Sequence, residues 1–311
     1  MKQRNGIHIA QDCIDINDRG LAYGDGVFET IASIGGVLHN WDLHWQRLQS
    51  GTRRLAIDLP EEHYFLERIN HKLIQQADQK SLLSANRVIK IIVTRGQGGR
   101  GYLYPEPHKP TIIISVHAWP ERAIADYHLG IRATLCQTCL AKQPALAGIK
   151  HLNRLEQVLA RNEFSSSHFQ EGIMLACSDK PLTHTISMDS LIIEGTSSNL
   201  FFVNNGCLLT PVIDTCGVQG TIRQAVLALA EQKGIPTEEN HFVLGDLKNA
   251  SEVFFTNSIF GILPVASITV SNDVEWYFDL QNAAGKSQHN LSSPLAMTIN
   301  KALNRPATKL N

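Results

Sequence analysis

Residues 147–160 read Ala-Gly-Ile-Lys-His-Leu-Asn-Arg-Leu-Glu-Gln-Val-Leu-Ala and set one lysine, Lys150, directly before an amphipathic segment. Apolar residues recur there at three- and four-residue spacing, which predicts a helix from Leu152 onward with one buried face. That face consists of Leu152, Leu155, Val158 and Leu159. Lys150 then lies just outside the helix, where partial burial can remove its proton. A neutral lysine amine attacks carbonyl groups, so Lys150 is a candidate for covalent chemistry; the alternative is a solvated surface charge.

The composition excludes several classes of function. Basic and acidic residues are interspersed and give a net charge of -1, so no basic stripe is present to bind nucleic acid or an anionic membrane surface. The start of the chain is not followed by the apolar core of a signal peptide, and no stretch reaches about 18 uninterrupted apolar residues. We therefore expect a cytoplasmic protein with a small-molecule substrate and with neither nucleic acid nor membrane as a partner.

Six cysteines are scattered through a chain of 311 residues, which is large enough to bury a core without disulfides. This pattern predicts reduced thiols. Cys136 and Cys139 have the spacing of a metal or redox pair, but two ligands are only half of what structural zinc needs. We interpret both as ordinary strand residues and expect no metal site.

The periodicity predicts two halves that mix strands and helices, an α+β or mixed α/β fold. In the first half the expected strands cover 6–10, 27–33, 37–39, 86–94 and 111–117, with helices at 43–55 and 61–76 and a turn-rich run at 17–26. In the second half the expected strands cover 131–136, 172–176, 190–194, 199–203, 207–211 and 252–256, with helices at 221–233 and after Leu291. The segment that follows residue 117 breaks both periodicities. We therefore expect a smaller N-terminal α/β domain (1–117), a linker (118–125) and a larger C-terminal domain (126–311) that carries Lys150.

Three features could bind an anion or a ring nitrogen. The helix expected from Thr221 follows a glycine, so the N–H groups of Thr221 and Ile222 form a possible phosphate site, to which Arg47 could add a guanidinium group. Glu194 ends an alternating strand, and a carboxylate there can pair with a protonated pyridine nitrogen. The alternatives are an ordinary helix cap, a surface arginine and a turn glutamate.

The glycine-rich segment from Arg95 to Tyr102 leads into a strand. It therefore lacks the helix that a P-loop or a dinucleotide fingerprint requires. Its arginines, Arg95 and Arg100, are suited to substrate carboxylates, whereas the alternative interpretation is a flexible hairpin.

Five motifs follow one another along the chain. They are DRGLAYGDGVFET at 18–30, HWQRL at 44–48, Lys150, EGTSSNLF at 194–201 and GTIR at 220–223. In this order they resemble the fold-type IV pyridoxal-phosphate enzymes over nearly the whole chain. Within that family, residues 95–102 and 147–159 resemble the lyases that convert 4-amino-4-deoxychorismate to 4-aminobenzoate and pyruvate in folate biosynthesis. Branched-chain or D-amino-acid transaminases are the alternative on the same fold, and a non-catalytic pyridoxal-phosphate-binding protein is the alternative in another class.

The resemblance implies a two-domain enzyme, similar to D-amino-acid aminotransferase, that works as a homodimer with pyridoxal 5'-phosphate. It implies that Lys150 holds the cofactor covalently and moves the proton, and that Glu194 pairs with the ring nitrogen. The other implied contacts are Arg47, Thr221, Ile222 and Ser258 for the phosphate, and Tyr23, Arg95 and Arg100 for the substrate. Transaminases carry a tyrosine where this chain has Leu155, so the partner of the cofactor hydroxyl stays open between Asn153 and Arg154.

Overall fold

The computed structural model describes residues 14–76, 86–166, 168–178, 186–271, 274–278, 295–296 and 299. The chain forms two compact units. The first contains Met1–Ala118 and Lys150–Asn153, and the second contains Trp119–Ile149 and Arg154–Asn311. The change from one unit to the other after Ala118 falls at the first residue of the predicted linker.

The segment Lys150–Asn153 belongs to the first unit, whereas the sequence placed Lys150 in the C-terminal domain. The reason is backbone pairing with strand β1 (Gly26–Ile34). The Phe28 N–H donates to the Lys150 carbonyl at 2.9 Å, and the Leu152 N–H donates to the Gly26 carbonyl at 3.0 Å. The lysine is thus held by main-chain hydrogen bonds to a strand that is distant in sequence, which local periodicity does not reveal.

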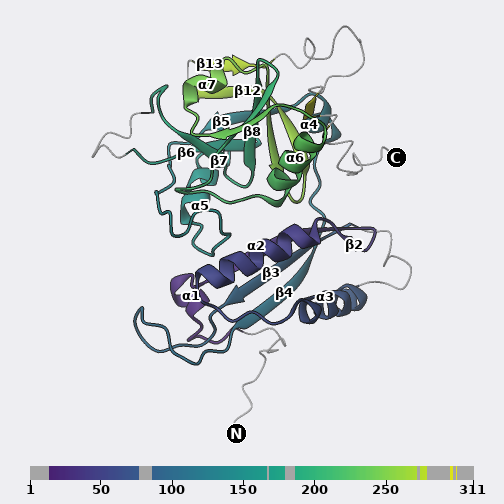
Figure 1. Ribbon diagram of the computed structural model, residues 1–311, viewed down its shortest axis with the longest axis vertical. Coiled ribbons are helices and arrows are strands. Elements are labelled where there is room, and N and C mark those ends of the chain that lie inside the picture. The colour runs from purple at the N-terminus through teal and green to yellow at the C-terminus, as the bar shows by residue number, and fades with distance from the viewer. Residues whose placement is uncertain are drawn as a thin grey trace. The chain divides into compact units, whose positions relative to one another are not determined.

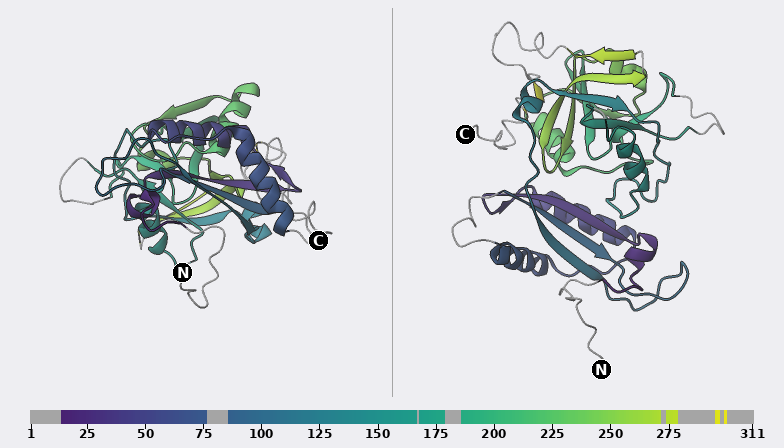
Figure 2. Two further views of the ribbon diagram at one scale, coloured as in Figure 1. Left: turned by 90° about the horizontal axis from the view of Figure 1, so that it is seen from below. Right: turned by 180° about the vertical axis from the view of Figure 1, so that it is seen from behind.

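The first unit is a four-stranded antiparallel sheet in the order β2-β1-β3-β4 (Figure 1; the right panel of Figure 2 shows it from behind). Its elements besides β1 are α1 (Arg19–Tyr23), β2 (Val37–Leu38), α2 (Trp41–Arg54), α3 (Glu62–Gln76), β3 (Arg87–Thr94) and β4 (Thr111–Ala118). Apolar side chains of the sheet pack with Leu48 of α2 and with Phe65 and Ile69 of α3 in one core. The strand expected at 6–10 lies outside the described residues.

Helix α1 forms within the run that the sequence predicted to be all turn. The Asp18 side chain accepts a hydrogen bond from the Gly20 N–H at 2.8 Å and caps the helix, and Gly24 ends it in the left-handed region at φ 66°. Five residues are too few for a helical period to show in the sequence.

The second unit contains a nine-stranded sheet among its described residues. Its strands are β5 (Ile131–Leu135), β6 (Glu171–Leu175), β7 (Ile192–Gly195), β8 (Asn199–Asn204), β9 (Cys207–Pro211), β10 (Thr237–Asn240), β11 (Glu252–Asn257), β12 (Gly261–Ser271) and β13 (Val274–Tyr277). Its helices are α4 (Ile124–His128), α5 (Leu155–Asn162), α6 (Thr221–Gln232) and α7 (Leu244–Lys248). The order β8-β11-β12-β5-β6-β7 returns to β8 through the pair Glu194 and Asn199, which closes a barrel. The helix expected after Leu291 lies mostly outside the described residues.

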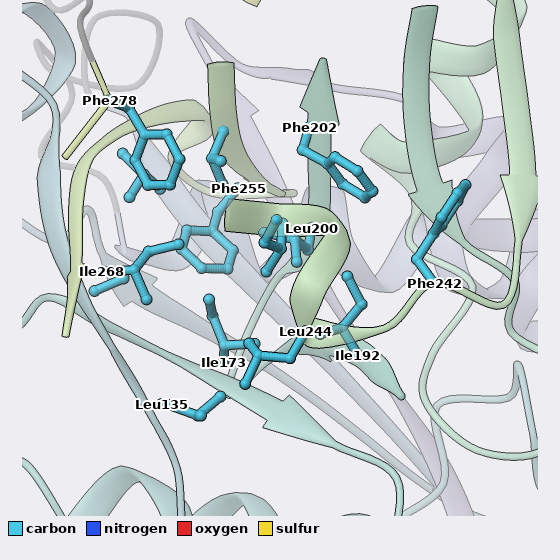
Figure 3. Close-up of a cluster of buried hydrophobic side chains, with 14 of the residues drawn as sticks. Leu135, Ile173, Ile192, Leu200, Phe202, Phe242, Leu244, Phe255, Ile268 and Phe278 are labelled. Atoms are coloured by element: carbon cyan, nitrogen blue, oxygen red, sulfur yellow. The ribbon is translucent and has the colours of Figure 1, made fainter. Parts of the chain in front are cut away.

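Strands β8 and β11 are buried on both faces, and successive side chains along each strand point to opposite sides. Leu200, Phe202 and Phe255 belong to one cluster, in which they lie near Ile192 and Leu244 (Figure 3). The alternate residues of the same strands, such as Phe201 and Phe254, pack instead against Ile222 and Val226 of α6. Helix α6 is therefore anchored by its apolar face, and its first residues are held at the ends of the strands.

The apolar face predicted for the segment after Lys150 is not buried in the single chain. Leu155 is 77% exposed, Val158 52% and Leu159 61%. Helix α5 begins at Leu155 rather than Leu152, and it packs on the sheet through Ala160 instead. The predicted direction of burial was wrong for the isolated chain.

The prediction of reduced thiols is corrected at one pair. Cys139 and Cys177 form a disulfide that links two segments 38 residues apart. Their backbones already lie side by side, since Leu140 pairs with Ala176 in a parallel bridge and donates from its N–H to the Leu175 carbonyl. Cys136, Cys207 and Cys216 are free.

Among the described residues, no helix combines the length and the apolar character needed to cross a membrane.

Candidate active site

Lys150 lies over an aromatic ring of the first unit. Its Nζ is 4.5 Å from the centroid of the Phe28 ring, and its backbone is fixed by the pairing with β1 described above. Lys90 of β3 approaches the same ring, with its Nζ 5.5 Å from the centroid. Both lysine side chains therefore lie against the same ring. Lys90 was not among the predicted site residues.

A buried ionic cluster occupies the other face of β1. Glu29 accepts hydrogen bonds from Arg47 Nε at 2.8 Å and from Arg47 Nη2 at 2.6 Å. His44 Nδ1 lies 2.6 Å from the same carboxylate. Since His44 and Arg47 are three residues apart on α2, they share the helix face that meets the strand. The Arg47 guanidinium is therefore held rigidly rather than at the surface.

Charge pairing decides the ionisation of this cluster. Burial alone would raise the pKa of Glu29, but the charges and hydrogen bonds of Arg47 and His44 outweigh it and lower the pKa from 4.5 to about 2. Burial lowers the pKa of His44 below its ordinary value of 6.5, although Glu29 opposes this. We infer a neutral His44 at pH 7 that donates from Nδ1, because an ionised carboxylate can only accept.

We expect Glu29→Gln to destabilise the protein by about 3 kcal/mol at pH 7, because Arg47 loses its buried counter-ion. The depressed pKa means that the contribution of Glu29 is complete above pH 4.5 and is lost as the pH falls toward about 2. Urea unfolding at several pH values should therefore show the wild type and the variant converging in acid. The exposed Glu61→Gln should match the wild type throughout, and a loss for Glu29→Gln that is equal at pH 2 and pH 7 would refute the ionic account.

In the second unit, Glu194 is buried and 4% exposed at the barrel closure. Its Oε2 accepts a hydrogen bond from the Val218 N–H at 2.9 Å, and the Asn199 side-chain amide donates to the Val218 carbonyl at 2.8 Å. Glu194 and Asn199 face each other across β7 and β8, and they hydrogen-bond the N–H and the carbonyl of Val218. These two hydrogen bonds fix the loop that precedes α6.

The start of α6 is built as the sequence predicted. Gly220 is the N-cap and supplies no side-chain cap, while Thr221 and Ile222 follow as the first, buried residues of the helix. A Cβ at Gly220 would lie 1.8 Å from Asn199 Oδ1, so only glycine fits there. Ser258 lies in the adjacent turn after β11, where Asn257 donates from Nδ2 to the Ser197 carbonyl at 3.2 Å. Backbone N–H groups at such a helix start suit an anion.

The predicted substrate arginines differ in their surroundings. Arg95 is 2% exposed and donates to the Asp25 carboxylate and to the carbonyls of Leu55 and Ala56. These contacts use four of the five guanidinium N–H groups and anchor the loop, so the role of Arg95 at the substrate stays a prediction. Arg100 is exposed, and the hydroxyl of the half-exposed Tyr23 accepts a hydrogen bond from the Gly101 N–H at 3.2 Å.

The two residues proposed for the cofactor hydroxyl have protein contacts of their own. The Asn153 side-chain amide donates to the Gly24 carbonyl at 3.1 Å within the first unit. Arg154 Nη2 donates to the Ile149 carbonyl at 3.3 Å within the second. Their contacts favour neither residue, so the assignment stays a prediction.

Sequence reasoning did not assign Glu29, His44 or Lys90. Glu29 could have been found from the sequence, because an acidic residue in the middle of a buried strand needs a cationic partner. The segment HWQRL contains such a cation, Arg47. Lys90 carried a weaker signal, as a lysine inside the apolar run of β3.

The two units and the residues described above are those of a class IV aminotransferase. The chain belongs to the amino-transferase class IV family, whose family model matches residues 26–268. It is 32% identical to an aminodeoxychorismate lyase of Vibrio harveyi over 92% of this chain and 98% of that protein. It is 37% identical to the crystal structure of 4-amino-4-deoxychorismate lyase from Pseudomonas aeruginosa, with a TM-score of 0.75 and 94% of each chain covered.

Transaminases are also similar to this chain. A putative branched-chain-amino-acid aminotransferase of Methanocaldococcus jannaschii is 32% identical over 82% of each protein. The fold-type IV assignment is confirmed, and the chain is an enzyme of that fold. The lyase of Vibrio harveyi matches 92% of this chain, whereas this aminotransferase matches 82%.

Proposed function

We propose that this chain is a pyridoxal-phosphate-dependent lyase that converts 4-amino-4-deoxychorismate to 4-aminobenzoate and pyruvate. The observation that carries the choice of reaction is the 37% identity to the lyase structure from Pseudomonas aeruginosa over 94% of each chain, together with the 32% identity to the Vibrio harveyi lyase. The purified protein loaded with the cofactor is expected to release 4-aminobenzoate when chorismate, glutamine and the upstream synthase supply its substrate. Failure to form 4-aminobenzoate, or the lack of a visible absorbance band that borohydride removes, would contradict the proposal.

The residues of each unit fit the cofactor. The uncapped start of α6 offers N–H groups at Thr221 and Ile222, and the glycine before it leaves room that a Cβ would fill. Arg47 brings a fixed guanidinium group, and Glu194 brings a buried carboxylate for a ring nitrogen. We assign the phosphate to Arg47, Thr221, Ile222 and Ser258.

When bound, pyridoxal phosphate supplies an electron sink for negative charge that develops on the substrate. Lys150 would hold the cofactor covalently, and its Nζ would be the base that removes the proton beside the substrate amine. Loss of that proton is followed by cleavage of the ring C–O bond, and the ring becomes aromatic. Lys150 can return the proton to the enolpyruvate that leaves, which gives pyruvate. Glu194 keeps the ring nitrogen protonated.

The same proposal includes a homodimer in the cytoplasm. Its support is the apolar face of α5, where Leu155, Val158 and Leu159 are left exposed in a single chain although their spacing is that of a buried face. A second copy of the chain would cover such a face.

Lys90 is proposed to bind a carboxylate of the substrate, which carries two, because its ammonium group lies beside the Phe28 ring that Lys150 also contacts. We expect Lys90→Met to raise KM about tenfold with kcat within about threefold of the wild type, since it removes an attraction present in both ground and transition states. Lys90→Arg should restore most of the affinity. The measurement is steady-state kinetics of the wild type and both variants. A fall in kcat at unchanged KM would contradict this role of Lys90.

A further inference from the structure

Glu171, the first residue of β6, is a buried carboxylate, 3% exposed, that neutral donors surround. Its Oε1 accepts hydrogen bonds from the Gly172 N–H at 3.0 Å, the Thr196 N–H at 3.1 Å and the Thr196 hydroxyl. Its Oε2 accepts from the hydroxyls of Ser197 at 3.0 Å and Ser198 at 2.9 Å. A buried charge without a cation is tolerated only when its hydrogen bonds are satisfied in this way.

Four of these donors come from one short turn, which joins β7 to β8. The Gly195 N–H donates to the Ser198 carbonyl at 2.7 Å and closes the turn. A Cβ at Gly195 would lie 2.2 Å from Ser198 Oγ and 3.2 Å from Glu171 Cδ, so the turn is folded tightly around the carboxylate. Glu171 thus acts as the acceptor around which this turn forms.

The turn determines where Glu194 points. Glu194 directly precedes Gly195 in β7, which has only four residues, and it pairs with Met174 of β6 and Asn199 of β8. Because side chains alternate along a strand, a shift of the turn by one residue would move Glu194 to the other face of the sheet. It would also break the hydrogen bonds that Glu194 and Asn199 make with the backbone of Val218.

We propose that Glu171 is a positioning residue for Glu194, holding the Gly195–Ser198 turn so that the Glu194 carboxylate faces the ring nitrogen of the cofactor. The inference rests on the proposed function, in which Glu194 makes that contact. Glu171 itself has its oxygens occupied by the turn, so it acts through Glu194.

Glu171→Gln keeps the size of the side chain but replaces one acceptor oxygen with an NH₂ group. The amide oxygen can still accept from the N–H groups of Gly172 and Thr196, and the Ser197 and Ser198 hydroxyls can rotate to accept from the NH₂ group. The hydrogen bonds to the oxygen then lack the negative charge that makes such bonds about twice as strong. The turn therefore loosens, and Glu194 protonates the ring nitrogen less well. The result should resemble a weakened version of Glu194→Gln.

The test is a pH titration of the visible absorbance band of the cofactor-loaded protein, a readout that needs no turnover. Glu194→Gln defines the full shift of the midpoint, and Glu171→Gln should move it in the same direction by about a third or more of that shift. Glu252→Gln is the matched control, because Glu252 is also buried but pairs with Val203 at the opposite end of β8. It should leave the midpoint where the wild type has it.

Two outcomes separate the possible failures. If Glu194→Gln does not move the midpoint, the assigned role of Glu194 in the proposed function is wrong, and the role of Glu171 falls with it. If Glu194→Gln moves the midpoint but Glu171→Gln behaves like Glu252→Gln, only the positioning role is overturned. Should Glu171→Gln fail to fold, Ser198→Ala removes one donor to the same carboxylate and should give a smaller shift in the same direction, and an unmoved midpoint would count against the inference.

Discussion

Lys150→Ala is expected to lower the rate of 4-aminobenzoate formation by about a thousandfold or more and to remove the visible band of the covalently bound cofactor. The reason is that one amine serves both as covalent anchor and as proton carrier, and the other lysine near it, Lys90, lies farther from the shared Phe28 ring. The measurement is single-turnover kinetics together with an absorbance spectrum.

The matched control for this substitution is Lys142→Ala, which removes a lysine from the same connection between β5 and α5. It should keep the spectrum and the rate. Because the Lys150 backbone accepts from the Phe28 N–H, and alanine keeps that carbonyl, unfolding curves of Lys150→Ala should stay close to those of the wild type. A variant that folds, lacks the Lys150 amine and still turns over at a near-normal rate would refute the assignment.

Several long elements could be predicted from the sequence because each carries a period of its own, but the longest strand, β12, was not predicted. The pattern of 27–33 gave β1, and that of 61–76 gave α3 within one residue. The short helices α1 and α7 were missed because five residues are too few to show a helical period, and β10 was missed because its four residues are all polar.

Helix α5 shows what periodicity cannot decide. The spacing of Leu155, Val158 and Leu159 correctly marks an amphipathic helix, yet all three side chains are exposed in one chain. An apolar face indicates that something covers it, but it does not say whether this is the same chain or a second copy.

The glycine and helix start at 220–223 were predictable because they form one local motif. Contacts between residues that are distant in sequence were not predictable. Glu171 lies 25 residues from Thr196, and Asp25 lies 70 from Arg95, so their pairing appears only in the folded chain. Arg95 is an example. Its sequence context suggested contact with a substrate carboxylate, whereas in the folded chain its guanidinium group donates to Asp25 and to two backbone carbonyls.

The distinction between lyase and transaminase rests on the fate of the amino group. A transaminase leaves the amino group on the cofactor and must pass it to a keto acid, so it needs a second substrate. A lyase returns the cofactor to its starting form in each cycle. The identities of 37% and 32% to two lyases support the second case. Residues 95–102 and 147–159 are the segments whose sequence resembles that of lyases.

The most direct test is to measure 4-aminobenzoate and pyruvate formed from 4-amino-4-deoxychorismate by the cofactor-loaded protein with no keto acid added. We expect equal amounts of the two products over many turnovers, and we expect branched-chain and D-amino acids to convert the cofactor to its amine form only slowly. An obligatory keto acid, or an ordinary amino acid with a kcat/KM higher by orders of magnitude, would contradict the lyase assignment and leave a transaminase on the same fold.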